Sequence, residues 1–103
     1  MRSYQLSPEA LQDLQNIWDF IAEHSSSAAD KLEDDFFAAF EKLARSPGLG
    51  HTRADLADLN LRFWPTRNYL IAYRRKRYTL QIVAVLHGAR DIPEVIRKRK
   101  AGD

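Results

Sequence analysis

The stretch that decides the fold is residues 78–91, YTLQIVAVLHGARD. Residues Tyr78–Leu86 are rich in β-branched and aliphatic side chains and are apolar at nearly every position, which predicts a strand buried on both faces at the centre of a sheet. The pattern stops at His87–Asp91, where an imidazole, a guanidinium and a carboxylate surround Gly88. We expect Gly88 to allow a turn that would strain a larger residue. A polar cluster directly after a packed strand is a candidate binding or reactive site.

Before this strand, the sequence predicts one short strand and two helices. The short strand is predicted over Ser3–Leu6. Ser7 followed by Pro8 predicts a helix start, because serine caps a helix and proline needs no N–H at the first helical position. Apolar residues at helical spacing carry this helix to about His24 and predict a second helix from residue 27 or 28 to residue 44 or 45. The short connection between the helices favours an antiparallel hairpin.

The second half of the chain predicts three strands and a last helix. Leu61–Trp64 is a predicted strand ended by Pro65, Tyr69–Arg74 is the next, and Arg75–Arg77 is the predicted turn into the long strand. A short helix is predicted over Ile92–Lys100. The whole chain, residues 1–103, is thus predicted to be one α+β domain of order β-α-α-β-β-β. We expect the helical hairpin on one face of a small, mainly antiparallel sheet, with a short C-terminal helix.

Composition excludes several kinds of site. The 103 residues include no cysteine, so disulfides, thiolate nucleophiles and cysteine-ligated zinc are excluded. No stretch is long and apolar enough for a membrane span, and the first residues do not resemble a signal peptide. The three histidines, His24, His51 and His87, lack the spacing of metal ligands, so we predict neither a metal nor a cofactor. We expect the protein to be cytoplasmic.

Charge is unevenly distributed along the chain. Residues 1–61 carry 5 basic and 11 acidic side chains, whereas residues 62–103 carry 11 basic and 3 acidic ones. Such asymmetry is consistent with an acidic partner or nucleic acid at the basic half. It is equally consistent with two halves that neutralise each other across the fold.

Four groups of residues follow one another in a characteristic order: Leu6-Ser7-Pro8-Glu9-Ala10 with Asp13-Leu14 and Ile17-Trp18-Asp19-Phe20-Ile21, then Ser46-Pro47-Gly48-Leu49-Gly50 with Arg53 and Asp55-Leu56, then Arg62-Phe63 with Tyr69–Arg74, and finally Val85–Asp91. Together they resemble the ParE branch of the RelE/ParE toxin superfamily over almost the whole chain. The resemblance implies the toxin of a type II toxin–antitoxin pair, often called a plasmid stabilisation protein. It implies inhibition of DNA gyrase and neutralisation by a ParD-like antitoxin, in a complex expected to be 2:2.

The alternative implied by the same fold is a RelE-like, ribosome-dependent mRNA endoribonuclease without a metal. Its candidate catalytic residues are His87, Arg67, Arg62 and Tyr73, since such an enzyme needs an acid, a base and cations at one phosphate. The absence of Asp and Glu between Leu59 and Ala89 favours a binding protein over an enzyme. His87 also fits a strand-end histidine that bonds the backbone, and Asp91 fits either a helix cap or an ion pair with Arg90.

The predicted partner surface combines apolar and basic residues of the second half. Strand alternation places Val83 and Val85 opposite Ile82, Ala84 and Leu86, so both faces of the last strand are apolar. A helical hairpin covers one face, and we expect much of the other face and a groove at its border to remain uncovered and to take an acidic antitoxin segment. Sequence-specific DNA binding by this chain alone is not expected. The candidate partner-binding residues are Trp64, Tyr69, Tyr73, Arg74, Arg75, Arg77, Val83, Val85, His87 and Arg90.

Overall fold

A computed structural model describes residues 3–101, with side chains through Arg99. Its elements are β1 (Tyr4–Leu6), α1 (Pro8–Ala22), α2 (Ser26–Arg45), the 3-10 turns η1 (Pro47–Leu49) and η2 (Ala54–Leu59), β2 (Arg62–Thr66), β3 (Tyr69–Lys76), β4 (Thr79–His87) and α3 (Ile92–Ala101). The strands form one sheet in the order β1-β4-β3-β2, in which β1 runs parallel to β4 and the other pairs are antiparallel. The α+β class and element order are confirmed, and β4 lies inside the sheet as predicted.

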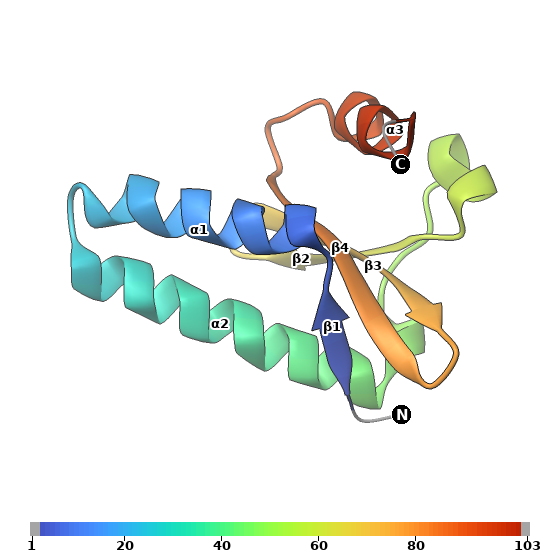
Figure 1. Cartoon of the computed structure of the whole chain (residues 1–103), viewed down its shortest axis with the longest axis horizontal. Helices are drawn as coiled ribbons and strands as arrows, with labels where there is room; N and C mark the ends of the chain where they lie inside the picture. Colours follow the sequence, from blue (N-terminus) through green and yellow to red (C-terminus); the bar gives the residue numbers. More distant parts are fainter. Residues whose placement is uncertain (1–2, 102–103) are drawn as a thin grey trace.

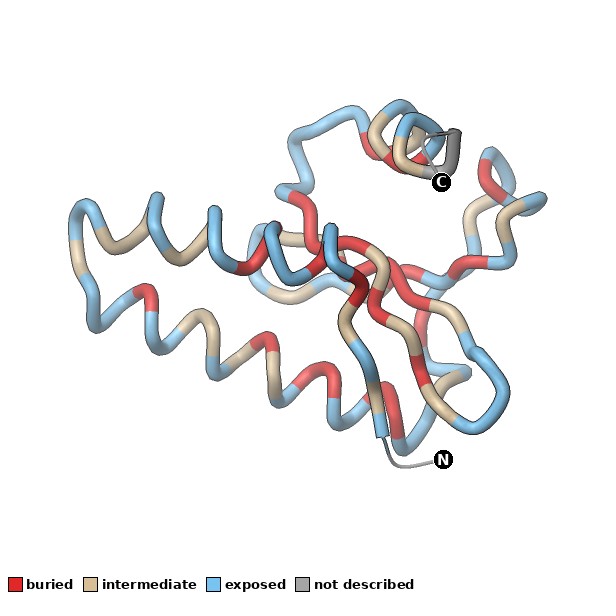
Figure 2. Tube along the Cα trace, in the orientation of Figure 1, coloured by how far each residue is buried: buried red, intermediate tan, exposed pale blue. Residues whose placement is uncertain are grey.

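The helices α1 and α2 form the predicted hairpin and cover one face of the sheet (Figure 1). Ser7 caps α1 by accepting the N–H of Ala10, and Ser25 caps α2 by accepting that of Ala28. Buried residues lie along the sides of the helices that face the sheet (Figure 2). The core on this face combines residues of both helices and the two central strands: Ala10, Leu14, Phe36, Ala39, Phe40, Leu43, Ile71, Tyr73, Leu80, Ile82 and Val85.

Less of the other face of the sheet is uncovered than the sequence predicts, although a groove does remain. α3 and η2 pack there through Ile92, Ile96 and Leu56, against sheet residues that include Ala84 and Leu86. Figure 1 shows α3 and η2 apart from the α1–α2 layer. Because α3 and η2 are short, they cover only part of this face, and a groove remains between them.

A register shift in β4 changes which residues share a face. Ala72 pairs with Ala84 whereas the next residue, Tyr73, pairs with Ile82, so Val83 is an extra residue in β4. Such a bulge reverses the alternation of side chains beyond it. Val85 therefore belongs to the core under the hairpin, while Val83 packs with the α3 cluster. The prediction that Val83 and Val85 share a face is wrong for this reason.

The hairpin loops also differ from the predicted ones. Pro65 lies inside β2, which it can do because β2 is an edge strand and needs no donor on its outer side. The β3–β4 loop is the pair Arg77-Tyr78, since Lys76 still pairs with Thr79. Arg77, like Arg67 in the β2–β3 loop, adopts a left-handed conformation, with φ of 57° and 56° respectively.

Candidate functional site

The predicted cluster after β4 forms a turn that leads into α3. His87 Nδ1 accepts the N–H of Ala89 at 3.1 Å, so the backbone-bonding interpretation of His87 is confirmed. Its ring also meets the ring of Tyr69 edge-on, with centroids 5.2 Å apart. Gly88 has a negative φ and its N–H donates to Asn68 O at 2.8 Å. The expectation that Gly88 supplies a strained turn is therefore wrong, since a regular backbone conformation suffices there.

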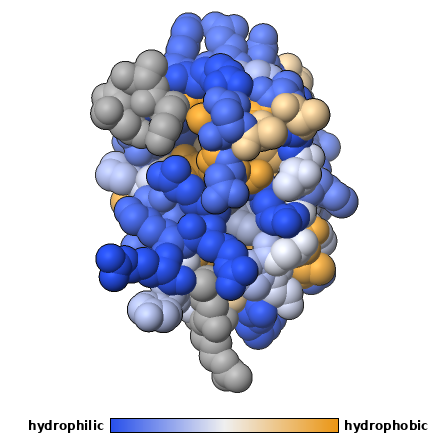
Figure 3. All heavy atoms as spheres, turned by 90° about the vertical axis from the view of Figure 1, so that its right-hand side faces the viewer, coloured by the Kyte–Doolittle hydropathy of each residue, from blue (hydrophilic) through white to orange (hydrophobic). Residues whose placement is uncertain are grey.

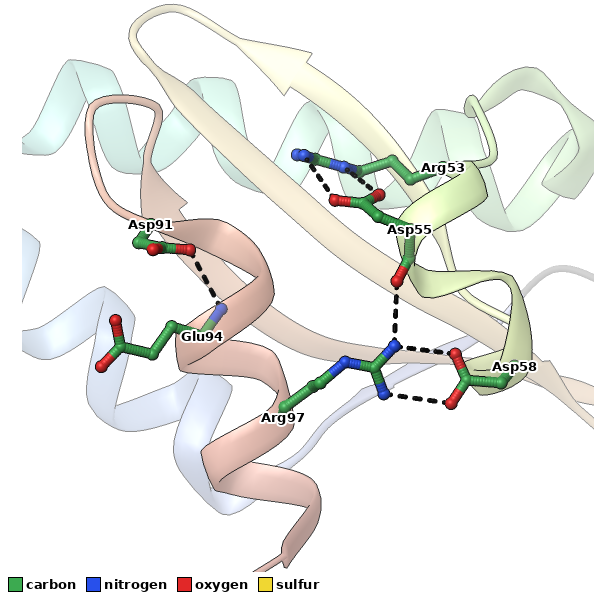
Figure 4. Close-up of polar contacts among 6 residues, drawn as sticks. All are labelled: Arg53, Asp55, Asp58, Asp91, Glu94 and Arg97. Atoms are coloured by element: carbon green, nitrogen blue, oxygen red, sulfur yellow. Dashed lines mark hydrogen bonds and ion pairs between the residues drawn. The ribbon is translucent and has the colours of Figure 1, made fainter.

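Asp91 is a helix cap, which decides between its two predicted roles. Its Oδ1 accepts the N–H of Glu94 at 3.1 Å (Figure 4). Among the described residues, Arg90 makes no ion pair with this carboxylate or with another. The Arg90 side chain is exposed and is thus available for an external ligand.

A hollow of about 410 Å³ lies between α1 and the end of β4. Its lining includes Ile17, Phe20, Tyr69, His87 and Arg90. A second hollow, about 380 Å³, lies beside it at the tip of the helical hairpin and shares Phe20, Tyr69 and His87. Phe20 is 66% exposed, so an aromatic surface faces solvent. Sequence reasoning missed Phe20 as a contact, although its place beside the apolar stripe of α1 was a usable signal.

The four candidate ribonuclease residues do not form one site but fall into two pairs. Arg67 and His87 both line the second hollow, whereas Arg62 pairs with Tyr73 across β2 and β3. Tyr73 is fully buried, and its hydroxyl donates to Pro47 O at 2.6 Å and accepts the N–H of Gly50 at 2.8 Å. Burial raises the pKa of Tyr73. Arg62 donates to Gly50 O at 2.8 Å, so both side chains hold the η1 loop.

Strand geometry separates Tyr73 from His87, although Tyr73 pairs with Arg62 of β2. His87 pairs with Tyr69, and Tyr73 lies four residues further along the strand, or about 13 Å away. Arg67 lies in the β2–β3 loop and forms an ion pair with Asp35 of α2 at 2.7 Å. Tyr73 is thus a core residue, and the structure corrects its assignment to either candidate set.

Val85 is the second candidate that the structure places in the core. Its side chain is 2% exposed, and its N–H donates to Asp13 Oδ2 at 3.0 Å. Asp13 is itself buried and binds the Arg99 guanidinium through both oxygens, at 2.7 and 2.8 Å. This pair joins α1, β4 and α3, and the interaction raises the pKa of Arg99. Sequence reasoning missed it, although Asp13 stands next to Leu14 on the inner side of α1.

The groove on the partly covered face of the sheet has a volume of about 310 Å³. Val83, Leu59, Leu61 and Ile96 supply its apolar lining, and its polar lining includes Arg74, Gln81, Glu9 and Arg99. Arg74 Nε donates to Gln81 Oε1 at 2.9 Å, which orders the side chain along the sheet. Figure 3 looks onto the right-hand side of Figure 1, where apolar atoms lie among strongly hydrophilic side chains. Arg74 and Val83, both predicted partner residues, meet at this groove.

α3 closes one side of the groove through contacts with η2. Arg97 binds both carboxylate oxygens of Asp58, at 3.0 and 2.9 Å, and the backbone oxygen of Asp55 at 2.9 Å (Figure 4). The hydrogen bond with Arg97 lowers the pKa of Asp58. Arg53 in turn binds Asp55. Polar contacts therefore hold α3 on two sides, through Arg97 to η2 and through Arg99 to Asp13 of α1.

The model of the family described as "ParE toxin of type II toxin-antitoxin system, parDE" matches residues 4–92 of the sequence. The chain belongs to the ParE toxin family. A solved structure described as the chromosomal ParDE TA system from P. aeruginosa has the same fold, with a TM-score of 0.70 and 20% sequence identity. The alignment covers 84% of this chain and 96% of the other. Curated proteins gave no significant match.

The remaining candidates of this ParE-family chain lie apart from both hollows and the groove. Trp64 is half-buried, with Lys42 Nζ of α2 5.1 Å from its ring centroid. Arg75 and Arg77 are exposed at the tip of the β3–β4 hairpin. Within the described part of the chain, no three histidine, aspartate or glutamate side chains gather as metal ligands. No helix of that part is long and apolar enough to cross a membrane.

Proposed function

We propose that this ParE-family toxin inhibits DNA gyrase and is neutralised by a ParD-like antitoxin. The observation that carries the proposal is a surface with a groove and a hollow, on which the four candidate ribonuclease residues do not form one group. Tyr73 and Arg62 of the ribonuclease set instead hold a loop. The family match supports the toxin role, and the ParDE neighbour supports an antitoxin partner.

The groove is the proposed antitoxin site. Its apolar lining suits the apolar side of a partner helix, and the neighbouring Arg74, which forms no ion pair with a described residue, suits an acidic residue of that helix. An acidic segment that folds as it binds would complete the cover that α3 and η2 begin. We expect a 2:2 complex in the cytoplasm, as the family resemblance implies.

The hollow beside β4 is the proposed contact with gyrase. Aromatic and arginine side chains carry much of the binding energy in protein interfaces. The hollow supplies both kinds, because Phe20, His87 and Arg90 are exposed there and Tyr69 is half-buried.

Induced expression followed by separate assays tests the target. We expect growth arrest, loss of DNA supercoiling by purified gyrase, and no ribosome-dependent mRNA cleavage. Phe20→Ala should abolish gyrase inhibition, whereas Leu11→Ala is the matched control, because Leu11 is an exposed residue of the same helix at 59%. Arrest of translation with supercoiling unaffected would contradict the gyrase proposal and favour the ribonuclease.

A second pair of variants tests the antitoxin site with the protein encoded next to the toxin gene. Arg74→Glu should weaken the complex at least tenfold in titration calorimetry, since it places a like charge against an acidic segment. Arg45→Glu, an equal charge change on the exposed side of α2, should have little effect. Equal affinities for Arg74→Glu and wild type would place the antitoxin elsewhere, without affecting the conclusion about gyrase.

A further inference from the structure

The β3–β4 hairpin ends in a run of basic side chains that the groove and the hollow do not use. Arg75, Lys76 and Arg77 are all exposed. None of them forms an ion pair with another described residue. The chain has no acidic residue between Leu59 and Ala89, so both strands of the hairpin lack a carboxylate that could neutralise this charge. The tip therefore presents a positive charge to solvent.

Tyr78 stands at the same tip and is 87% exposed. It is the most exposed of the large hydrophobic side chains on the described part of the molecule. A tyrosine in that position contributes nothing to the core, yet its aromatic face is open to a ligand. The tip thus joins three cations to one accessible aromatic ring.

The backbone holds this tip in a defined shape. Lys76 pairs with Thr79 across a loop of two residues, and Arg77 takes a left-handed conformation with φ of 57°. Ser3 holds the start of β4 next to the loop, because its backbone oxygen accepts the Leu80 N–H at 3.1 Å and the Thr79 hydroxyl at 3.2 Å. Figure 1 shows the loop at the edge of the molecule, away from α3, and Figure 2 shows it as exposed.

We propose that the tip of the β3–β4 hairpin, residues 75–78, binds a single strand of nucleic acid without sequence preference. The cations contact phosphates, and Tyr78 stacks on an unpaired base, the combination by which proteins bind single strands. A protein partner fits less well, because the tip lacks the apolar floor that the groove offers. The inference goes beyond the proposed function and does not depend on gyrase being the target.

Fluorescence anisotropy with labelled oligonucleotides tests the proposal on the purified full-length chain. The probes are single-stranded DNA, duplex DNA and single-stranded RNA of one sequence, each titrated over a range of salt concentrations. We expect single strands to bind more tightly than the duplex. The slope of log affinity against log salt concentration measures the number of phosphate contacts. Replacing Arg75, Lys76 and Arg77 together by glutamine should make this slope less negative by about 2, the value for three phosphate contacts on a single strand.

The matched control carries glutamine at Lys31, Lys42 and Arg45, three exposed cations of α2. It has the same net charge as the hairpin variant and should bind like wild type. Tyr78→Ala should weaken single-strand binding about tenfold or more, and Tyr78→Phe should restore it, because stacking needs the ring and not the hydroxyl. Circular dichroism confirms that each variant is folded.

Three outcomes would overturn the proposal. One is equal binding by the hairpin variant and wild type, and another is an equal loss in the α2 control, which would make the effect one of net charge alone. The third is that the hairpin variant loses affinity for the antitoxin while its affinity for oligonucleotides is unchanged, which would make the tip a protein contact. A difference between the DNA and RNA probes decides which nucleic acid is preferred.

Discussion

Gly50 is a residue at which one added carbon should be costly. A Cβ there would lie 2.7 Å from Cε1 and 2.8 Å from Cζ of the buried Tyr73 ring. Backbone and ring would both have to move, and overpacking of this kind costs about 1–3 kcal/mol. We therefore expect Gly50→Ala to lower the free energy of unfolding by that amount in urea denaturation.

Gly88→Ala is the natural comparison for Gly50→Ala. Its added Cβ would meet only Asn68 O, at 3.4 Å, and φ is negative at both glycines. We expect a change below about 0.5 kcal/mol, as for substitutions away from special features. Equal losses at the two positions would contradict the importance of the Tyr73 contact.

The Tyr73 hydroxyl should make stability depend on alkaline pH. Burial raises its pKa above the ordinary 10.0, so the folded state favours the neutral phenol. The contribution of the neutral hydroxyl to the free energy of unfolding is fully present below pH 10 and is lost as the pH rises through the folded pKa. Tyr73→Phe should cost about 1–3 kcal/mol at pH 7, because Gly50 N–H and Pro47 O lose their partner.

Between pH 10 and 11, the free energy of unfolding of Tyr73→Phe should fall less steeply with pH than that of wild type. Urea denaturation at several pH values measures both slopes. Tyr4 and Tyr69, whose pKa values are also raised by burial, are present in both proteins and cancel from the comparison. A parallel decline in the two proteins would show that ionisation of Tyr73 does not limit stability.

At the scale of elements, the spacing of apolar residues predicted the strands and helices. It did not predict which side chains of β4 lie on each face of the sheet. Alternation predicts a face only while the register is regular, and the extra residue Val83 reverses it. The bulge is held from outside the strand: Ser7 Oγ donates to Val83 O at 3.3 Å, and Asp13 accepts the Val85 N–H. These contacts join residues more than 70 positions apart, so local sequence carries no sign of them.

The loops show a similar limit at the ends of the strands. Two-residue hairpin loops usually carry Asn-Gly or Asp-Gly, which this sequence lacks at both sites. Arginine occupies the left-handed position instead, in Arg67 and Arg77. The sequence therefore predicted the β3–β4 turn too early, at Arg75–Arg77, and the exposed position of Tyr78 at the tip was not recognised.

At the scale of the whole molecule, the candidate residues were partly predictable because an apolar strand followed by polar residues does mark a sheet end. His87, Tyr69 and Arg90 were proposed from the sequence and share one hollow. The sequence did not show that α3 would fold back over the sheet. Ile92 and Ile96 gave a weak apolar side to a short, basic helix, and its anchors, Asp58 and Asp13, lie far away in sequence.

α3 should open independently of the rest of the molecule. It has ten residues, and helices shorter than about 12–15 residues are marginal without tertiary contacts. Its described contacts with the rest of the molecule include the packing of Ile92, Val95 and Ile96 and the ion pairs of Arg97 and Arg99. We therefore expect native-state hydrogen exchange to give α3 amides a lower opening free energy than the central amides of β4, which exchange only on global unfolding.

Asp13→Asn tests whether the buried pair sets that opening energy. The amide oxygen can still accept the Val85 N–H, but the charge that binds Arg99 is lost. Since the Arg99 side chain is 25% exposed, we expect a reduction in α3 opening energy of about 1–3 kcal/mol, less than for a fully buried pair. Asp34→Asn, at an exposed position of α2, should leave the opening energy unchanged. If Asp13→Asn lowered the protection of β4 and α3 equally, α3 would belong to the same cooperative unit as the sheet. The groove would then keep its shape until the whole chain unfolds.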